Sequence, residues 1–124
     1  MEGFRQPHSG SNRRIRAKAA RELAEIFDSK LFKALCEPVR IDIVKFLTAE
    51  GRCDVQTVAA QFPQHASVVS RHLGILHQAG VVQRQKIGRH VFFEVDGQEM
   101  VDRMERILER FRNILPLCCA RVES

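Results

Sequence analysis

The stretch "SVVSRHLGILHQAGVVQRQKIGRHVFFEV", residues 67–95, decides the fold and has an unusual charge distribution. It contains Arg, Lys and three of the chain's five His, but its only acid is Glu94. In the wider window from Val55 to Phe93 there is no Asp or Glu, although the chain has fifteen. At the average rate roughly five acids are expected there, so this region is depleted of negative charge.

The apolar spacing within the same stretch changes from helical to strand-like. Residues 66–78 predict a helix with Val69, Leu73 and Leu76 inward, and "AG" at 79–80 ends it. Two β-rich runs follow, "VVQRQ" and "HVFFEV", and the "KIGR" between them contains a glycine that suits a hairpin turn. Upstream, Asp54 is placed to cap another short helix, which Pro63 closes. Two short helices, a tight turn and a basic hairpin predict a winged helix-turn-helix.

Amphipathic helices flank this motif. Residues 15–28 predict a first helix, Pro38 suits the start of another, and Asp96 with Glu99 forms a capping-box pattern before a long helix that Pro116 ends. We therefore expect a mainly α fold with a small β-hairpin, a winged helix-turn-helix that dimerises through its N- and C-terminal helices.

The domain organisation expected is simple. Residues 1–12 read as a disordered N-terminal tail, residues 13–115 as one DNA-binding and dimerisation domain, and residues 116–124 as a C-terminal tail that contains Cys. No run of eighteen apolar residues and no signal peptide is visible, which predicts a soluble, cytoplasmic protein without membrane contact. The four Cys are irregularly spaced, so we expect reduced thiols.

The charge distribution favours a nucleic-acid partner. The net charge is +5 and the isoelectric point is near 9.4. A carboxylate on a face that approaches phosphate would be repelled, so an acid-free winged motif fits double-stranded DNA. The alternatives are a basic solvated surface on a generic helical domain and a winged-helix module that binds protein or RNA. An enzyme is not expected, because the acid-free window leaves no carboxylate near His72 or His77 in the sequence, and no phosphate loop or nucleophile motif appears.

Three segments resemble the ArsR/SmtB family of small homodimeric winged-helix repressors: "LFKALCEPVRIDIVKFL", "SVVSRHLGILHQAGVV" and "GRHVFFEV". The resemblance covers about residues 24–112. It implies a repressor that leaves its operator when it binds a metal or metalloid, or when it senses a sulfur or redox signal. It also implies DNA contacts from seven residues of the helix and the hairpin: Ser67, Ser70, Arg71, His72, Lys86, Arg89 and His90.

Each of these seven has a structural alternative, such as a backbone hydrogen bond for Ser70 or a half-buried place for His72. Arg71 and Arg89 are the stronger candidates, because Arg serves both phosphates and guanine edges. The family often has Ser and Gln where this chain has His65 and Ala66. With fewer base-reading groups at that point, we expect more reliance on DNA shape or phosphate contacts.

Two metal sites known in the family are incomplete in this chain. A Cys-x-Cys-Asp arrangement is needed for one of them, and "EGRCD" supplies only Cys53. A zinc site on the last helix needs His, and residues 97–124 contain none. No permanent cofactor is expected.

The adjacent Cys118 and Cys119 in "LPLCCARVES" are the remaining effector candidates. Adjacent thiols do not readily close a relaxed disulfide, yet both suit one soft thiophilic ion such as arsenite. Cys53 and Cys36 are the candidates for a third ligand. The alternatives are a frayed tail without function and a thiol redox or reactive-sulfur switch, which the position at a helix C-terminus disfavours because the helix dipole opposes thiolate there.

Overall fold

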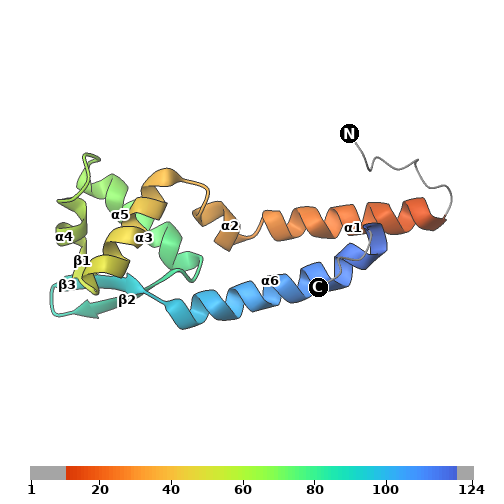
Figure 1. Ribbon diagram of the computed structural model, residues 1–124. Helices are drawn as coiled ribbons and strands as arrows, with labels where there is room; N and C mark the ends of the chain where they lie inside the picture. Colours follow the sequence, from red (N-terminus) through yellow and green to blue (C-terminus); the bar gives the residue numbers. More distant parts are fainter. Residues whose placement is uncertain (1–10, 120–124) are drawn as a thin grey trace. The chain divides into compact units, whose positions relative to one another are not determined.

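The computed structural model describes residues 11–119, which form two compact units (Figure 1). The winged unit comprises residues 29–105. The helical-pair unit comprises α1 (Ser11–Phe27) and the part of α6 (Gly97–Cys118) from residue 106 onward. Ser11 and Asn12, expected in the tail, belong to α1; the rest of that expected tail, and residues 120–124 of the C-terminal one, lie outside the described residues.

The helices of the winged unit begin and end at residues suited to those places. Ser29 caps α2 (Lys30–Ala34), and Pro38 occupies the first turn of α3 (Pro38–Glu50), where its missing N–H costs nothing. Asp54 caps α4 (Val55–Ala59): its Oδ1 accepts a hydrogen bond from Thr57 N at 2.8 Å. The predicted helix 66–78 is confirmed as α5 (Ala66–Gln78), and Gly80 follows it with a φ of +79°.

A three-stranded antiparallel sheet has the order β1-β3-β2, with β1 (Cys53–Asp54), β2 (Val82–Ile87) and β3 (His90–Val95). The predicted hairpin is confirmed: β3 has the predicted bounds, whereas β2 starts one residue later and ends two residues later than expected, because Lys86 and Ile87 pair with β3. The turn is Gly88–Arg89, and Gly88 has the positive φ of 61° that this two-residue turn needs. Strand β1 was not predicted; Cys53 pairs there with Phe93.

The core of the winged unit lies where α3, α4 and α5 pack against one another and against the sheet (Figure 1). Three residues of α5 contribute to it, at the helical spacing that the sequence indicated. The largest fully buried side chains of this unit are Ile43, Leu47, Val58, Val69, Leu73, Leu76, Val81 and Val82. The unit thus has a hydrophobic core of its own, which fixes α5 and the hairpin in one framework.

Helix α6 starts as predicted but continues past the predicted end. Glu99 N donates to Asp96 Oδ1 at 3.1 Å, which confirms the cap, while the Glu99 carboxylate pairs with Arg103 at 2.9 Å. The expectation that Pro116 ends the helix is wrong, since α6 runs to Cys118. Proline removes one helical N–H, but Cys119 N still donates to Leu115 O at 2.8 Å and closes the next turn.

In the helical-pair unit, α1 and the second half of α6 lie antiparallel. Arg110 pairs with Glu25 at 3.4 Å, and the rings of Phe27 and Phe111 meet edge to face at 5.9 Å. At the other end, the Arg16 guanidinium donates to the carbonyl of Cys118. In the part of the chain that the structure describes, no helix is long and apolar enough to cross a membrane.

Candidate nucleic-acid interface

The exposed face of α5 carries Ser67, Ser70 and Arg71, as the sequence indicated. The helix begins at a histidine cap: the backbone N–H of Ser67 donates to His65 Nδ1 at 3.1 Å. His65 is therefore the N-cap of α5, a position that Ser, Thr or Asp occupies in most helices. The first two turns of α5 thus present two hydroxyls, one guanidinium and no acid.

His72, the fourth α5 residue of the predicted DNA contacts, does not share that face. It is 9% exposed and lies at the inward spacing set by Val69, Leu73 and Leu76. Arg40 Nη1 on α3 donates to His72 Nδ1 at 3.1 Å, because a guanidinium has no acceptor. Burial lowers the pKa of His72, and the neighbouring charges of Arg40 and Arg71 lower it further. His72 is therefore a neutral, hydrogen-bonded residue that joins α5 to α3.

The hairpin exposes Lys86, Arg89 and His90. In the β2–β3 register Lys86 lies opposite Val91 and Ile87 lies opposite His90. Because side chains alternate along a strand, Lys86 and His90 stand on opposite faces of the hairpin, with Arg89 at its turn. A duplex groove that takes the tip of the wing would meet all three, whereas a flat surface would meet only one face.

One acid lies close to the wing in space, although it precedes the acid-free window in sequence. The pairing of β1 with β3 brings Asp54 Oδ2 to 3.6 Å from His90 Nδ1. The pKa of Asp54 is lowered, first by its hydrogen bonds with Thr57 and then by the His90 charge. His90 is thus the wing residue that lies beside a protein carboxylate, and the same Asp54 also caps α4.

Two further cations belong to this surface and were absent from the predicted set. Arg84 is exposed on β2. The Arg52 guanidinium lies 5.3 Å from the centre of the Phe92 ring, and its Nη1 donates to Gln85 Oε1 at 3.0 Å. Arg84 could have been found in the acid-free window itself. Arg52 could not, because only the unpredicted strand β1 brings it to the hairpin.

The two adjacent thiols lie at the end of α6. Their Sγ atoms are 3.2 Å apart, and Cys118 Sγ is also 3.7 Å from Leu115 O. Burial raises the pKa of Cys118, and so do its hydrogen bond with Cys119 and the charge of that neighbour, while Arg16 acts in the opposite direction. Two sulfurs are thus available to one soft ion, and both protons must leave before both sulfurs can bind.

The other two thiols are separate from each other in the winged unit. Cys36 is exposed in the turn after α2, and Cys53 is half-buried on the edge strand β1. Burial raises the pKa of Cys53, as do the charges of Glu50 and Asp54. Within residues 11–119, no three His, Cys, Asp or Glu side chains cluster as a metal site would require.

Comparisons with known proteins agree with this geometry. The family model for bacterial regulatory proteins of the arsR family matches residues 37–84, which run from the start of α3 into β2. The chain is 31% identical to a crystal structure described as a possible transcriptional regulator for arsenical resistance, with a TM-score of 0.56. That match covers 67% of this chain and 84% of the solved one.

Two curated relatives carry names that mention regulation. The chain is 43% identical over 74 residues to the HTH-type transcriptional repressor SmtB of Mycobacterium tuberculosis, which is 57% of this chain and 53% of that protein. It is 28% identical over 86 residues to a cadmium resistance transcriptional regulatory protein CadC homolog of Staphylococcus aureus, 69% of this chain and 71% of that protein. The chain thus spans about half the length of SmtB and 71% of the length of the CadC homolog.

Proposed function

Because the chain belongs to the ArsR family of winged-helix regulatory proteins, we propose that it is a homodimeric transcriptional repressor of double-stranded operator DNA. We propose further that its operator is released when Cys118 and Cys119 bind a soft metal or metalloid, arsenite first among them. The exposed face of α5 and the tip of the hairpin, within residues 66–90, carry several cations and no acid of their own, and this is the observation that carries the DNA-binding role.

The contacts divide between the two elements of that surface. Ser67, Ser70 and Arg71 lie on the first two turns of α5, the part of a recognition helix that enters the major groove. Lys86, Arg89 and His90 lie on the wing, where cations serve the phosphate backbone. With His72 turned inward, Arg71 is the α5 side chain best suited to reach a base edge.

Dimerisation is supported by the helical-pair unit. Ile15, Phe27, Leu108 and Leu117 on α1 and α6 are 41–54% exposed, although all four are large and apolar. A two-fold partner would cover such a surface and place two recognition helices at the spacing of an operator with two half-sites. The name of one neighbour of the same fold, a possible ArsR-family regulator from Mycobacterium bovis at 22% identity, describes a homodimer.

Effector binding by the thiols is supported by the two Sγ atoms of Cys118 and Cys119, which lie 3.2 Å apart at the end of α6. Soft thiophilic ions compete well with protons for such sulfurs. A third ligand would have to come from Cys53 or Cys36. The relatives named for arsenical and cadmium resistance make metalloid or cadmium ions the first effectors to test.

A redox or reactive-sulfur switch is the second candidate, favoured by the contact between the two Sγ atoms. The raised pKa of Cys118 weakens it, because the thiolate is the form that oxidants attack. A winged-helix module for protein or RNA is the alternative of another class, and it would need neither operator DNA nor thiols.

Sequencing the genomic DNA fragments that the purified protein retains tests this proposal. The retention is repeated with arsenite, cadmium, zinc and peroxide. We expect a few fragments with two-fold symmetric sequences, lost on addition of arsenite or cadmium. Loss with peroxide alone would favour the redox switch, and retention of random fragments or of none would contradict the repressor assignment.

A further inference from the structure

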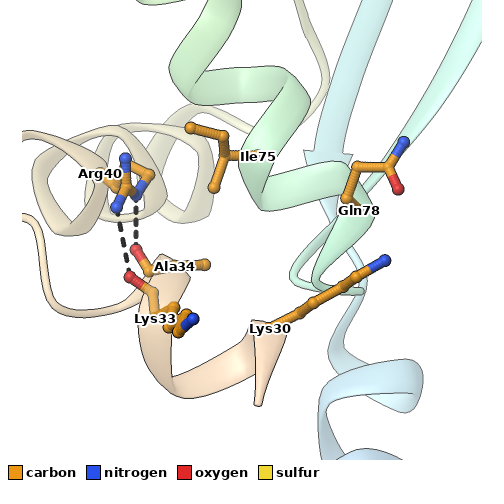
Figure 2. A pocket seen from close by; sticks show the side chains of 6 residues that line it. All are labelled: Lys30, Lys33, Ala34, Arg40, Ile75 and Gln78. Carbon is orange, nitrogen blue, oxygen red and sulfur yellow. Dashed lines mark hydrogen bonds between the residues drawn. The ribbon is translucent and has the colours of Figure 1, made fainter. Parts of the chain in front are cut away.

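A cavity of about 410 Å³ opens between α2, the start of α3 and the second half of α5, within the winged unit (Figure 2). Three of its lining residues are cationic and none is acidic. The residues that line it are Lys30, Lys33, Ala34, Arg40, Ile75 and Gln78. The volume lies in the range of small-ligand pockets, and Figure 2 shows Ile75 and Gln78 across the opening from the α2 residues.

Two of the three cations of this cavity, Lys30 and Arg40, have donors to spare. No ion pair or hydrogen bond engages the Lys30 ammonium within the part of the chain that the structure describes. Arg40 donates to Ala34 O at 2.7 Å, Lys33 O at 3.2 Å and His72 Nδ1 at 3.1 Å, as Figure 2 shows for the first two. These bonds use three of the five guanidinium N–H groups, which leaves two and holds the group rigidly.

Two apolar residues, Ile75 and Ala34, line the cavity beside these cations. Ile75 is 37% exposed although it lies on the same helix as the buried core residues Leu73 and Leu76, and Ala34 beneath it is fully buried. A small inorganic anion would use the cations and leave Ile75 in water. A neutral apolar molecule would cover Ile75, but it would displace water from the Lys30 ammonium without offering that ammonium a hydrogen-bond acceptor. A ligand that satisfies both parts has an anionic head and a short apolar body.

We propose that this cavity binds a small organic carboxylate with a short apolar chain. The carboxylate lies against the Lys30 ammonium, which Figure 2 shows on the Gln78 side of the cavity, and the chain packs on Ile75, while Arg40 adds positive charge at the other end. Gln78 lies beside the carboxylate with an amide that both donates and accepts. The site uses none of the four thiols, so it stands whether or not they sense a metal.

Calorimetric titration of the full chain with hexanoate tests this site, with hexanamide and inorganic phosphate as matched probes. We expect hexanoate to bind and the other two to bind at least about tenfold more weakly, since one charge-assisted hydrogen bond contributes that much. Amide NMR spectra should place the largest shifts at Ile75 and Gln78. Equal binding of hexanamide or of phosphate would contradict the proposed ligand class.

Two variants locate the site. Lys30→Ala should weaken hexanoate binding about tenfold, whereas Lys45→Ala, which removes an exposed lysine on α3 outside the cavity, should not. Both positions are exposed, so both variants should fold. Unchanged hexanoate binding by Lys30→Ala would overturn the proposal. So would a parent that ignores hexanoate while Lys30→Ala weakens DNA binding, because the cations would then serve the DNA backbone.

Discussion

The two units of the molecule use apolar residues in opposite ways. Within residues 11–119, twelve of the fifteen buried apolar residues belong to the winged unit, and the helical-pair unit contributes the other three, Ala19, Ile26 and Ile114. The helical-pair unit exposes four large apolar side chains and thus exposes more than it buries, whereas the winged unit exposes five and buries twelve. Two helices alone have too little interior to bury an apolar stripe on each, so the difference is what we expect of a unit that a second chain completes, as in the proposed dimer.

The same contrast separates the functional groups. The winged unit has its own core, so it can hold Arg71 and Arg89 in fixed places for DNA without help from a partner. The helical-pair unit holds Cys118 and Cys119, and its packing would change with whatever covers its apolar surface. An input at the thiols can reach the DNA-binding surface of both protomers if it alters the dimer, which is how we expect the repressor to work.

The largest effect is expected from charges placed in the helical pair. Leu108→Glu with Phe111→Glu puts two carboxylates per protomer into the proposed seam, and each costs on the order of several kcal/mol if it is cut off from water. We expect sedimentation to show a monomer whose winged unit keeps its secondary structure.

The matched control places the same charges on the winged unit. Ile41 and Ile87 are 38% and 44% exposed there, so Ile41→Glu with Ile87→Glu should leave the dimer intact. A dimer that survives the change in the helical pair, or that dissociates with the control, would contradict the claim that the helical-pair unit forms the dimer interface.

The independent core of the winged unit is tested by Leu73→Ala. Leu73 is fully buried, and its truncation should lower the free energy of unfolding by roughly 2–5 kcal/mol in denaturant titrations. The same truncation at the exposed Ile87 should cost less than about 0.5 kcal/mol. Similar losses at the two positions would mean that the winged unit has no well-packed core.

The two arginines of the proposed DNA surface should differ in what they contribute to binding. Arg71→Ala should reduce the discrimination between operator and random DNA by roughly 1–3 kcal/mol if the guanidinium reaches a base edge. Arg89→Ala should weaken binding to all sequences and lower the salt slope by about one unit if it meets one phosphate. Salt titrations with operator and random duplexes measure both, and identical behaviour of the two variants would argue against this division.

The smallest effect concerns pH. The pKa of His72 lies below its ordinary value of 6.5 in the folded chain, with Arg40, Arg71 and Glu37 as the charges near it. The unfolded chain therefore takes up the proton first, and stability is lost as the pH falls below about 6.5 toward the folded pKa. His72→Gln keeps an acceptor for Arg40 but cannot titrate, so its unfolding midpoint should change less between about pH 7 and pH 5. Equal changes of the unfolding midpoint in the parent and in His72→Gln would show that His72 is not buried as a neutral ring.

The sequence predicts most of the winged unit because its signals are local. The spacing of Val69, Leu73 and Leu76 places α5, and Gly88 places the hairpin turn, since each depends on neighbours within a few residues. Strand β1 has only two residues, and its pairing with Phe93 is a contact across forty positions that no periodicity indicates. The end of α6 was missed because proline removes one helical hydrogen bond without always ending a helix.

The candidate site was predicted in part for the same reason. Exposure of Arg71 and Arg89 follows from the local pattern, whereas the inward place of His72 depends on Arg40, which comes from another helix. The proximity of Asp54 to His90, the place of Arg52 and the cavity lined by Lys30 and Ile75 also need the tertiary fold.

The most direct measurement is operator binding by fluorescence anisotropy in reductant, titrated with arsenite. The parent is compared with the Cys118→Ser, Cys119→Ser double variant and with single Cys36→Ser and Cys53→Ser variants. We expect the double variant to bind operator as the parent does but to ignore arsenite, because an effector drives release only by binding the DNA-free form more tightly. In the parent, a coupling of about 3 kcal/mol would weaken operator binding more than a hundredfold. A single variant that also loses the response identifies the third ligand, and release of the double variant at the parent's arsenite concentration would contradict a thiol input at the end of α6.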